Sequence, residues 1–521
     1  INYENTFKDV HKVNVLFGTS IFKTTGEFTG KKGFDIKGNS VVNASIAEAS
    51  SVEDRFQLRG RNDTFDSRLL SYFARLQYDY KGKYLLSAVV RRDGSSKFGP
   101  ANKFGIFPSG SIGWIASDED FLADSKTINF LKFRASYGIL GNDRIGDFRF
   151  VSLLNGEGTY VFNDQLVNGL APGVIANPEI RWEKQKTWDI GVDMKFLDNK
   201  LDITADYFKK TTEDLLVTPQ VSGIIGGGAA GSGAPTINAG VVENKGLEFE
   251  FWYSGNLSDN FKFSVKYNVT TIDNEVISVS SDGGFLSGGS FGVGQDPPSR
   301  MEAGYPIGYF RGFKTDGVFQ NQAEVDNSAV IDNNVQAGDL RFVDLNNDGE
   351  IDDDDKTYIG DPLPDATMGL NISFDYKDFD FSVYAFASLG NEIVRNYERN
   401  QNLTNKTVNY LNRWTGEGTS NTDPRVTSGA SSNGLFSDYF VEDGSFVRLQ
   451  NIQLGYTINP KSEDSTINKL RLYVSASNLF TLTEYRGYDP TASSGSPIGG
   501  GIDQGFYPNP KTFLFGLNLK F

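Results

Sequence analysis

Thr512-Phe-Leu-Phe-Gly-Leu-Asn-Leu-Lys-Phe521 is the stretch that decides the fold. Every odd-numbered residue in it is large and apolar, whereas most of the even-numbered residues are small or polar. A period of two is the pattern of a β-strand, whose side chains point alternately to its two faces. A soluble β-sandwich rarely ends on so bare an apolar strand, because that strand would be an edge and a frayed end at once. In a closed membrane barrel the last strand pairs with an earlier one and its apolar face meets lipid, so the stretch favours a barrel over a sandwich.

The composition argues against several classes of function. The 521 residues include no Cys and a single His, His11, and the formal net charge is -16. Without Cys there is neither a disulfide framework nor thiolate chemistry, and one His argues against catalytic triads and multi-His metal sites. The negative charge argues against nucleic acid as a partner. No apolar run of about 18 residues predicts a membrane helix, and no signal peptide starts at Ile1, so we expect a piece of a longer protein.

The alternation of the final stretch recurs along the whole chain. About 15 segments show it, each roughly 9 to 13 residues long, which is the length a tilted strand needs to cross a bilayer. The expected strands cover residues 2–7, 13–22, 72–78, 84–90, 107–114, 131–137, 188–196, 201–207, 247–253, 261–269, 368–376, 379–387, 452–458, 470–476 and 512–521. The sequence therefore predicts an all-β protein built from hairpins.

The connections between these strands are of two kinds. Turns at one end span a few residues, as near Asp9, Gly82, Asp198 and Lys377, apart from a longer one at 118–129. Connections at the other end are much longer: 23–70, 141–180, 211–243, 273–366, 391–444 and 481–510. Short periplasmic turns and long extracellular loops are typical of outer-membrane barrels, whereas loops of this length are uncommon in compact soluble domains. On this arrangement the first strand runs toward the periplasm, so an odd number of strands is expected before Ile1.

Several ordered motifs resemble one known family. They are the acidic segment 344–355 followed by Ile359-Gly-Asp-Pro-Leu-Pro-Asp365, Ser445-Phe-Val-Arg-Leu449, Leu454-Gly-Tyr456, Leu470-Arg-Leu-Tyr-Val474, Asn478-Leu-Phe-Thr481, Tyr485-Arg-Gly-Tyr-Asp-Pro490 and the Phe-ended last strand. Together they resemble the C-terminal part of the SusC/RagA-type TonB-dependent transporters of Bacteroidota outer membranes. The motifs span most of the chain and are specific as an ordered set.

The resemblance implies a fold and a set of partners. Such proteins have a barrel of about 22 strands around an N-terminal plug, so residues 1–521 would be the C-terminal barrel portion, without the plug and roughly seven strands. The implied partners are outer-membrane lipid, a SusD-like surface lipoprotein that closes over the loops, and TonB, which acts through the plug. Two such transporter–lipoprotein pairs would form a homodimer.

Residues 344–355 form the sharpest local motif. Oxygen-bearing side chains recur at Asp344, Asn346, Asp348, Glu350 and Asp355, and Gly349 occupies position six. This spacing matches a calcium loop, in which alternate residues supply ligands, a glycine makes the turn and an acid closes the site at position twelve. Asp355 stands where Glu is usual, and no helices flank the loop. We therefore expect a structural, loop-borne Ca²⁺ site, against the alternative of a solvated acidic loop without an ion.

Other candidate residues are less specific. Aromatic residues in the loops could stack on sugar rings or on peptide side chains, and Tyr305, Tyr309 and Phe310 are the substrate-binding candidates among them. Loop packing is the alternative explanation for each of these residues. Trp182, Phe285 and Phe291 belong to the same set. The Gly-rich segments 224–233 and 283–294 lack the Gly-Lys-Ser/Thr ending of a phosphate loop, and neither is followed by a helix pattern, so they are expected to be extracellular loops. Arg134, Asp189, Asp206, Glu248 and Lys266 are expected to face a wet lumen.

Three functions are compatible with these features. The leading one is TonB-dependent active import of a bulky nutrient, an oligosaccharide or a peptide, with no covalent chemistry and therefore no catalytic residues. The alternative is a transporter-like barrel that acts as a structural or assembly subunit of a larger outer-membrane complex. A barrel-borne hydrolase is disfavoured because no Ser–His–acid set is available.

Overall fold

The structure is a computed structural model of residues 1–521. It describes the whole chain except residues 28–30, 37–44, 55–63, 153, 155, 220–232, 282, 293, 398–406, 428–430, 461–465 and 492–496. The chain divides into two compact units. The first comprises Ile1–Trp114, Arg134–Trp188 and Lys210–Val242, and the second comprises Ile115–Phe133, Asp189–Lys209 and Glu243–Phe521.

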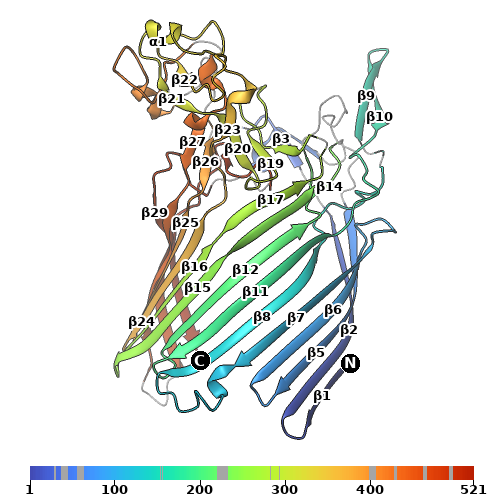
Figure 1. The fold of residues 1–521 in the computed structure, drawn as a ribbon, viewed down its shortest axis with the longest axis vertical. Helices are drawn as coiled ribbons and strands as arrows, with labels where there is room; N and C mark the ends of the chain where they lie inside the picture. The colour runs from blue at the N-terminus through green and yellow to red at the C-terminus, as the bar shows by residue number, and fades with distance from the viewer. Residues whose placement is uncertain are drawn as a thin grey trace. The chain divides into compact units, whose positions relative to one another are not determined.

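One large antiparallel sheet contains nearly all the long strands. It is built from β1 (Asn2–Phe7), β2 (His11–Glu27), β5 (Thr64–Tyr80), β6 (Tyr84–Ser95), β7 (Phe104–Ile115), β8 (Ile128–Asn142), β11 (Glu183–Phe196), β12 (Leu201–Glu213), β15 (Gly240–Ser258), β16 (Phe261–Thr271), β24 (Ala366–Tyr376), β25 (Phe379–Leu389), β28 (Phe446–Ile458), β29 (Lys469–Thr483) and β31 (Thr512–Lys520), each paired with the next, while β17 (Asp273–Val279) pairs with β15. In Figure 1 the blue strands β1, β2, β5 and β6 lie side by side, as do the green to orange strands β15, β16, β24 and β25. The predicted all-β meander is confirmed.

The strands are longer than expected at the ends that join long connections. β2 continues to Glu27 and β5 already begins at Thr64, so the connection expected at 23–70 shrinks to residues 28–63. Their pairing runs without a break from His11 opposite Tyr80 to Glu27 opposite Thr64. Polar residues such as Thr24 and Thr25 end the apolar alternation there but not the backbone pairing. The sequence pattern marks where the apolar face stops, whereas hydrogen bonding extends the strand beyond it.

Short turns close the other end of the hairpins. Lys8 and Asp9 join β1 to β2 with φ of 51° and 56°, and Lys81 and Gly82 join β5 to β6 with φ of 57° and 70°. Two successive residues with positive φ are the signature of the type I′ turn, whose twist matches that of the strands. The adjacent His11 ring accepts or donates a hydrogen bond at 2.8 Å with the Tyr78 hydroxyl. It is therefore a partnered residue beside a short turn.

The apolar faces of the strands are exposed. Phe513, Phe515 and Leu517 in β31 have exposed fractions of 64%, 84% and 59%, and Val474 and Leu472 in β29 are exposed as well. The register places Val474 opposite Phe515 and Leu472 opposite Leu517, so these residues share one face of the paired strands. A soluble sandwich would bury this face, whereas a barrel in a membrane turns it to lipid.

Ion pairs mark the polar face of the same sheet. Lys266 contacts Glu250 at 2.9 Å, Lys195 contacts Asp202 at 3.1 Å, and Arg471 donates two hydrogen bonds to Asp380. Arg471 alternates along β29 with Leu470 and Leu472, which places charge and apolar surface on opposite faces. Alternation of polar and apolar faces is the pattern expected of a wet lumen inside a lipid-facing wall.

Small elements occupy the long connections. They are β3 (Lys31–Phe34), β4 (Ser51–Asp54), β9 (Gly156–Phe162), β10 (Gln165–Ala171), β13 (Leu216–Val217), β14 (Ile237–Asn238), β18 (Phe285–Gly288), β19 (Ser299–Glu302), β20 (Tyr309–Phe313), β21 (Thr315–Val318), α1 (Gln322–Asp326), β22 (Leu340–Phe342), β23 (Lys356–Tyr358), β26 (Glu392–Arg395), β27 (Val441–Asp443) and β30 (Ile502–Asp503), with short 3-10 helices at Ile46–Glu48, Ala116–Asp118, Asp353–Asp355, Val408–Asn412, Ser432–Gly434 and Asp438–Phe440. Among the described residues, no helix is long and apolar enough to cross a membrane. Most of the Gly-rich segment 224–233 lies outside the described residues.

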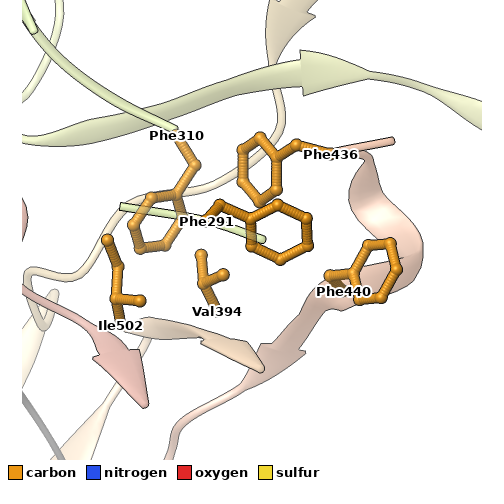
Figure 2. Packing of buried hydrophobic residues seen from close by; sticks show 6 residues of the cluster. All are labelled: Phe291, Phe310, Val394, Phe436, Phe440 and Ile502. Atoms are coloured by element: carbon orange, nitrogen blue, oxygen red, sulfur yellow. The ribbon is translucent and has the colours of Figure 1, made fainter. Parts of the chain in front are cut away.

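The loops of the second unit have hydrophobic cores of their own. Phe291, Phe310, Val394, Phe436, Phe440 and Ile502 pack together, as Figure 2 shows. A neighbouring cluster joins Phe313, Val318, Leu340, Phe342 and Ile351. Strands β20, β21, β22, β23, β26 and β27 gather with α1 beyond the ends of this unit's long strands (Figure 1). These connections are therefore a packed layer that can hold side chains in fixed positions.

Candidate functional site

A four-stranded sheet in the second unit carries the substrate candidates. Its order is β18-β19-β20-β23, and the register places Arg300 opposite Tyr309 and Arg311 opposite Tyr358. Residues that face each other across an antiparallel pair point to the same side of the sheet, as do residues two apart on one strand. Tyr309, Arg311 and their partners therefore share one face.

Three tyrosines form an aromatic platform on this face. Tyr305 and Tyr309 stack with ring centroids 4.5 Å apart and planes 20° apart. Tyr358 lies 5.9 Å from Tyr309 and 6.3 Å from Tyr305, with its plane within 22° of both. Tyr305 and Tyr358 are each 40% exposed, whereas Tyr309 is buried beneath them. Tyr305 and Tyr358 thus leave part of their rings accessible to solvent, and accessible aromatic rings are surfaces on which an apolar face of a ligand can stack.

Carboxylates fix two of these rings. The Tyr309 hydroxyl donates to Glu302 at 2.5 Å, and the Tyr358 hydroxyl donates to Asp361 at 2.6 Å. Burial, followed by these hydrogen bonds, raises the pKa of both phenols above their usual value. Both tyrosines thus stay protonated at neutral pH and keep a fixed orientation. They are suited to binding and carry no feature of an acid–base catalyst.

Phe310 does not join the platform. It is adjacent to Tyr309 in β20 and therefore points to the opposite face, where it is fully buried in the cluster of Figure 2. Phe291 lies in the same cluster, and Trp182 packs in a separate core of the first unit with Phe98 and Phe107. In this structure these three aromatics hold loops together.

The acidic loop 344–355 has the backbone turns of a closed loop. Both oxygens of Asp344 accept backbone N–H groups, from Asn347 at 2.6 Å and from Gly349 at 2.9 Å. Gly349, with φ of 90°, makes the turn at position six. Ile351 is buried in the loop core, which anchors this segment to the rest of the layer.

Asp355, at the end of the loop, holds its first and last parts together through hydrogen bonds. It is fully buried, and its two oxygens accept the backbone N–H groups of Leu345 at 2.7 Å and Asp352 at 3.0 Å. Among the described ion pairs, none joins Asp355 to a lysine or arginine. The donor set is all oxygen, which suits a hard cation such as Ca²⁺. Over the described residues, however, no three His, Cys, Asp or Glu side chains already converge as a metal site. Metal binding would therefore require carboxylates such as Asp348 to turn inward.

The loop layer of the second unit also contains a cavity of about 780 Å³. Tyr397, Tyr410, Arg413, Asp423, Arg425 and Tyr439 are among its lining residues. Arg425 is engaged by a two-pronged pair with buried Asp339, at 2.7 and 3.0 Å. The cavity is large enough for a small ligand, but one of the cations that line it, Arg425, is already neutralised by Asp339.

Sequence reasoning missed three residues of the tyrosine-bearing face. Arg311, Lys356 and Tyr358 stand beside the candidates only because β20 pairs with β23. The alternation Tyr309-x-Arg311-x-Phe313 was an available signal of a strand with one functional face. Its partner strand, some 45 positions later, has only three residues and cannot be recognised from its own sequence.

The fold and the exposed apolar faces together define a class of protein. A meander of long antiparallel strands with short turns at one end, structured loops at the other and apolar residues exposed along its strands is a transmembrane β-barrel wall.

Comparisons with known proteins specify the family. Residues 2–479 match the family described as TonB dependent receptor-like, beta-barrel, and the chain belongs to that family. The TonB-dependent receptor P3 of Formosa agariphila is 34% identical over 538 residues, covering 100% of this chain and 52% of its own length. The TonB-dependent receptor SusC of Bacteroides thetaiotaomicron is 33% identical over 467 residues, covering 87% of this chain and 44% of its own. The chain thus spans about half the length of these relatives.

A solved structure supports the fold. The structure of the RagAB peptide transporter matches 99% of this chain and 54% of its own chain with a TM-score of 0.78, at 22% sequence identity. The resemblance to SusC/RagA-type TonB-dependent proteins is confirmed, and with it the transmembrane β-barrel class and the location in the bacterial outer membrane.

Proposed function

We propose that the complete protein imports a bulky nutrient, an oligosaccharide or a peptide, across the outer membrane by TonB-dependent active transport. Family membership over residues 2–479 is the observation that carries this proposal. A SusD-like lipoprotein would close over the loops, and TonB would act on a plug contributed by the rest of the protein. RagAB, whose barrel subunit this chain resembles in fold, is described as a peptide transporter, which supports the class of activity and does not fix the cargo.

The work assigned to this chain is binding without covalent chemistry. The aromatic platform of Tyr305, Tyr309 and Tyr358 lies on a packed loop layer, so the ligand would meet a preformed surface. Preorganised rings lose little conformational freedom on binding, which improves affinity for a given contact area. Release inside would follow from a rearrangement that weakens these contacts, because transport requires a difference in affinity between two states.

We also propose that residues 344–355 bind Ca²⁺ as a structural ion. Asp344, Asn346, Asp348 and Asp355 would supply side-chain oxygens, and Glu350 an oxygen at position seven, which is commonly the backbone carbonyl. The buried Asp355 and the left-handed turn at Gly349 support this assignment. The ion would offset the mutual repulsion of the carboxylates and hold the loop against its neighbours.

Growth of the native bacterium tests the import proposal. A strain that lacks the gene and a strain whose protein lacks the TonB-binding segment would be grown on separate panels of oligosaccharides and peptides. Import predicts that both strains lose growth on the same class of nutrient. A different result would indicate a structural subunit: both strains grow normally on every nutrient, but in the strain that lacks the gene other outer-membrane proteins no longer assemble into their complex.

A further inference from the structure

A small cationic pocket lies on the same face as the tyrosine platform. Its volume is about 210 Å³, and the charged residues that line it are Arg300, Arg311, Lys356 and Asp296. Three cations and one carboxylate thus line the pocket, and the side chain of that carboxylate, Asp296, is 80% exposed. A pocket of this size and charge accommodates one anionic group.

The register places side chains of the pocket next to side chains of the platform on one face of the sheet. Arg300 lies opposite Tyr309, Arg311 lies opposite Tyr358, and Lys356 lies opposite Phe313. Side chains opposite each other in an antiparallel pair have Cβ atoms about 5 Å apart. One ligand can therefore contact the cations and the tyrosine rings at the same time.

Each cation is held in place while keeping hydrogen-bond donors for a ligand. The Arg300 guanidinium lies 3.9 Å from the centre of the Phe285 ring, and its contact with Glu302 is a loose 3.7 Å. Arg311 donates to the backbone carbonyl of Asp353 at 2.8 Å. No carboxylate is within ion-pair distance of Arg311 among the described residues. A guanidinium has five N–H donors, so most of those on Arg311 remain for a ligand.

Lys356 is the most engaged of the three cations. It contacts Asp353 at 2.6 Å and Asp296 at 3.6 Å. Arg311 makes no described ion pair, and with Arg300 and Lys356 it forms a local cluster of cationic side chains in a chain whose net charge is -16. A cluster of cations on an acidic protein can attract an anionic group locally.

We propose that this face binds an acidic oligosaccharide, whose carboxylate or sulfate group enters the pocket between Arg300, Arg311 and Lys356. A neighbouring sugar ring then stacks on the exposed faces of Tyr305 and Tyr358. The inference rests on the proposed import function and specifies its substrate class. Platform and pocket together match a chain of rings with repeated anionic groups. An acidic peptide would bind the same cations, and the binding test below distinguishes a peptide ligand from a sugar ligand.

Binding to the purified full-length protein tests this proposal. The probes are an oligogalacturonate, a sulfated oligosaccharide, a neutral oligosaccharide of the same length and an acidic peptide containing aromatic residues, measured by calorimetry at low and high salt. The variants Arg311→Gln and Lys356→Gln remove charge from the pocket. Arg341→Gln is the matched control, because Arg341 is a cation of the same loop layer that pairs with Asp316 at 2.7 Å and does not line the pocket.

The expected result is binding of at least one acidic oligosaccharide that weakens with salt. Each pocket variant should lose roughly 10-fold or more in affinity while the control stays within about 2-fold of the wild type. The proposal is overturned if neither acidic sugar binds, if the neutral sugar binds equally well, if the peptide alone binds, or if the pocket variants bind like the control.

An uptake assay separates this proposal from the proposed function. If the wild type binds the acidic sugar but cells do not take it up through TonB, the import proposal fails and the binding site stands. If cells import a nutrient through TonB and the pocket variants import it as well as the control, import stands and the acidic-sugar site is wrong.

Discussion

Arg448 donates a hydrogen bond to the Asp489 carboxylate at 2.5 Å, and both side chains are almost completely buried. Arg448 belongs to β28, whereas Asp489 lies in the last long connection. The pair thus joins the motif Ser445–Leu449 to the motif Tyr485–Pro490, so the two motifs are in direct contact in the folded chain. Asp489 also accepts hydrogen bonds from Thr491 and Asn509 and so organises the loop around itself.

Loss of Arg448 should open this loop. Arg448→Ala leaves the buried carboxylate of Asp489 without its cation, which costs about 3–5 kcal/mol. We expect faster proteolysis within residues 485–509 of the full-length protein in membranes. Arg486→Ala is the control, because Arg486 is more exposed and its pair with Glu442 should contribute about 1 kcal/mol or less. Equal cleavage of both variants would contradict the role given to Arg448.

Acid should open the same loop in a defined pH window. Burial raises the pKa of the Asp489 carboxyl, but hydrogen bonds from Thr491, Asn509 and Arg448 outweigh burial and lower it to about 2. Because this pKa is below the unfolded value of about 4, the contribution is complete above pH 4 and is lost as the pH falls toward 2. Pepsin cleavage of the loop should rise across that window, and Asp489→Asn should abolish the step. If the rise in pepsin cleavage between pH 4 and pH 2 persists in Asp489→Asn, groups other than Asp489 cause it.

Removal of calcium should loosen residues 344–355. Chelation, or Asp344→Asn together with Asp348→Asn, should speed hydrogen exchange in this loop and lower bound calcium by about one ion. Asp326→Asn, which changes an exposed acid of α1, should have neither effect. Unchanged calcium content in the double variant would contradict the site. Because Asp353 contacts both Arg311 and Lys356, a looser loop should also weaken anion binding.

The aromatic platform should contribute to ligand affinity without changing charge. Tyr305→Ala removes the exposed ring and should weaken binding of the imported nutrient about 3- to 10-fold, because a stacked ring contributes about 0.5–1.5 kcal/mol. Tyr507→Ala, at an exposed tyrosine distant in sequence from the platform, is the control. Ligand titrations followed by tyrosine fluorescence would measure both. Equal affinity in the two variants would exclude Tyr305 from the binding surface.

The sequence predicted the long strands of the large sheet better than the structure of the loops, for a physical reason. The apolar alternation of strands such as β29 is local, so each strand can be recognised from its own residues. The pairing of β20 with β23 depends on residues far apart in the chain, and no local pattern marks it. Phe310 looked like an exposed loop aromatic because its packing partners, Val394 and Phe436, lie more than 80 positions away. Tyr305 and Tyr309 are only four positions apart, so the chain itself keeps them close, and their rings stack in the structure.

Site-directed spin labelling tests most directly whether the apolar faces of these strands meet lipid. Because this chain contains no Cys, single cysteines introduced at Val474, Ser475 and Phe515 can each carry one nitroxide in the reconstituted full-length protein, once any Cys outside residues 1–521 has been replaced. If the apolar face meets lipid, labels at 474 and 515, which share that face, should collide with oxygen dissolved in the lipid. The label at 475 should instead collide with a water-soluble nickel complex. Labels at 474 and 515 that neither reagent reaches, as between two packed sheets, would contradict the account.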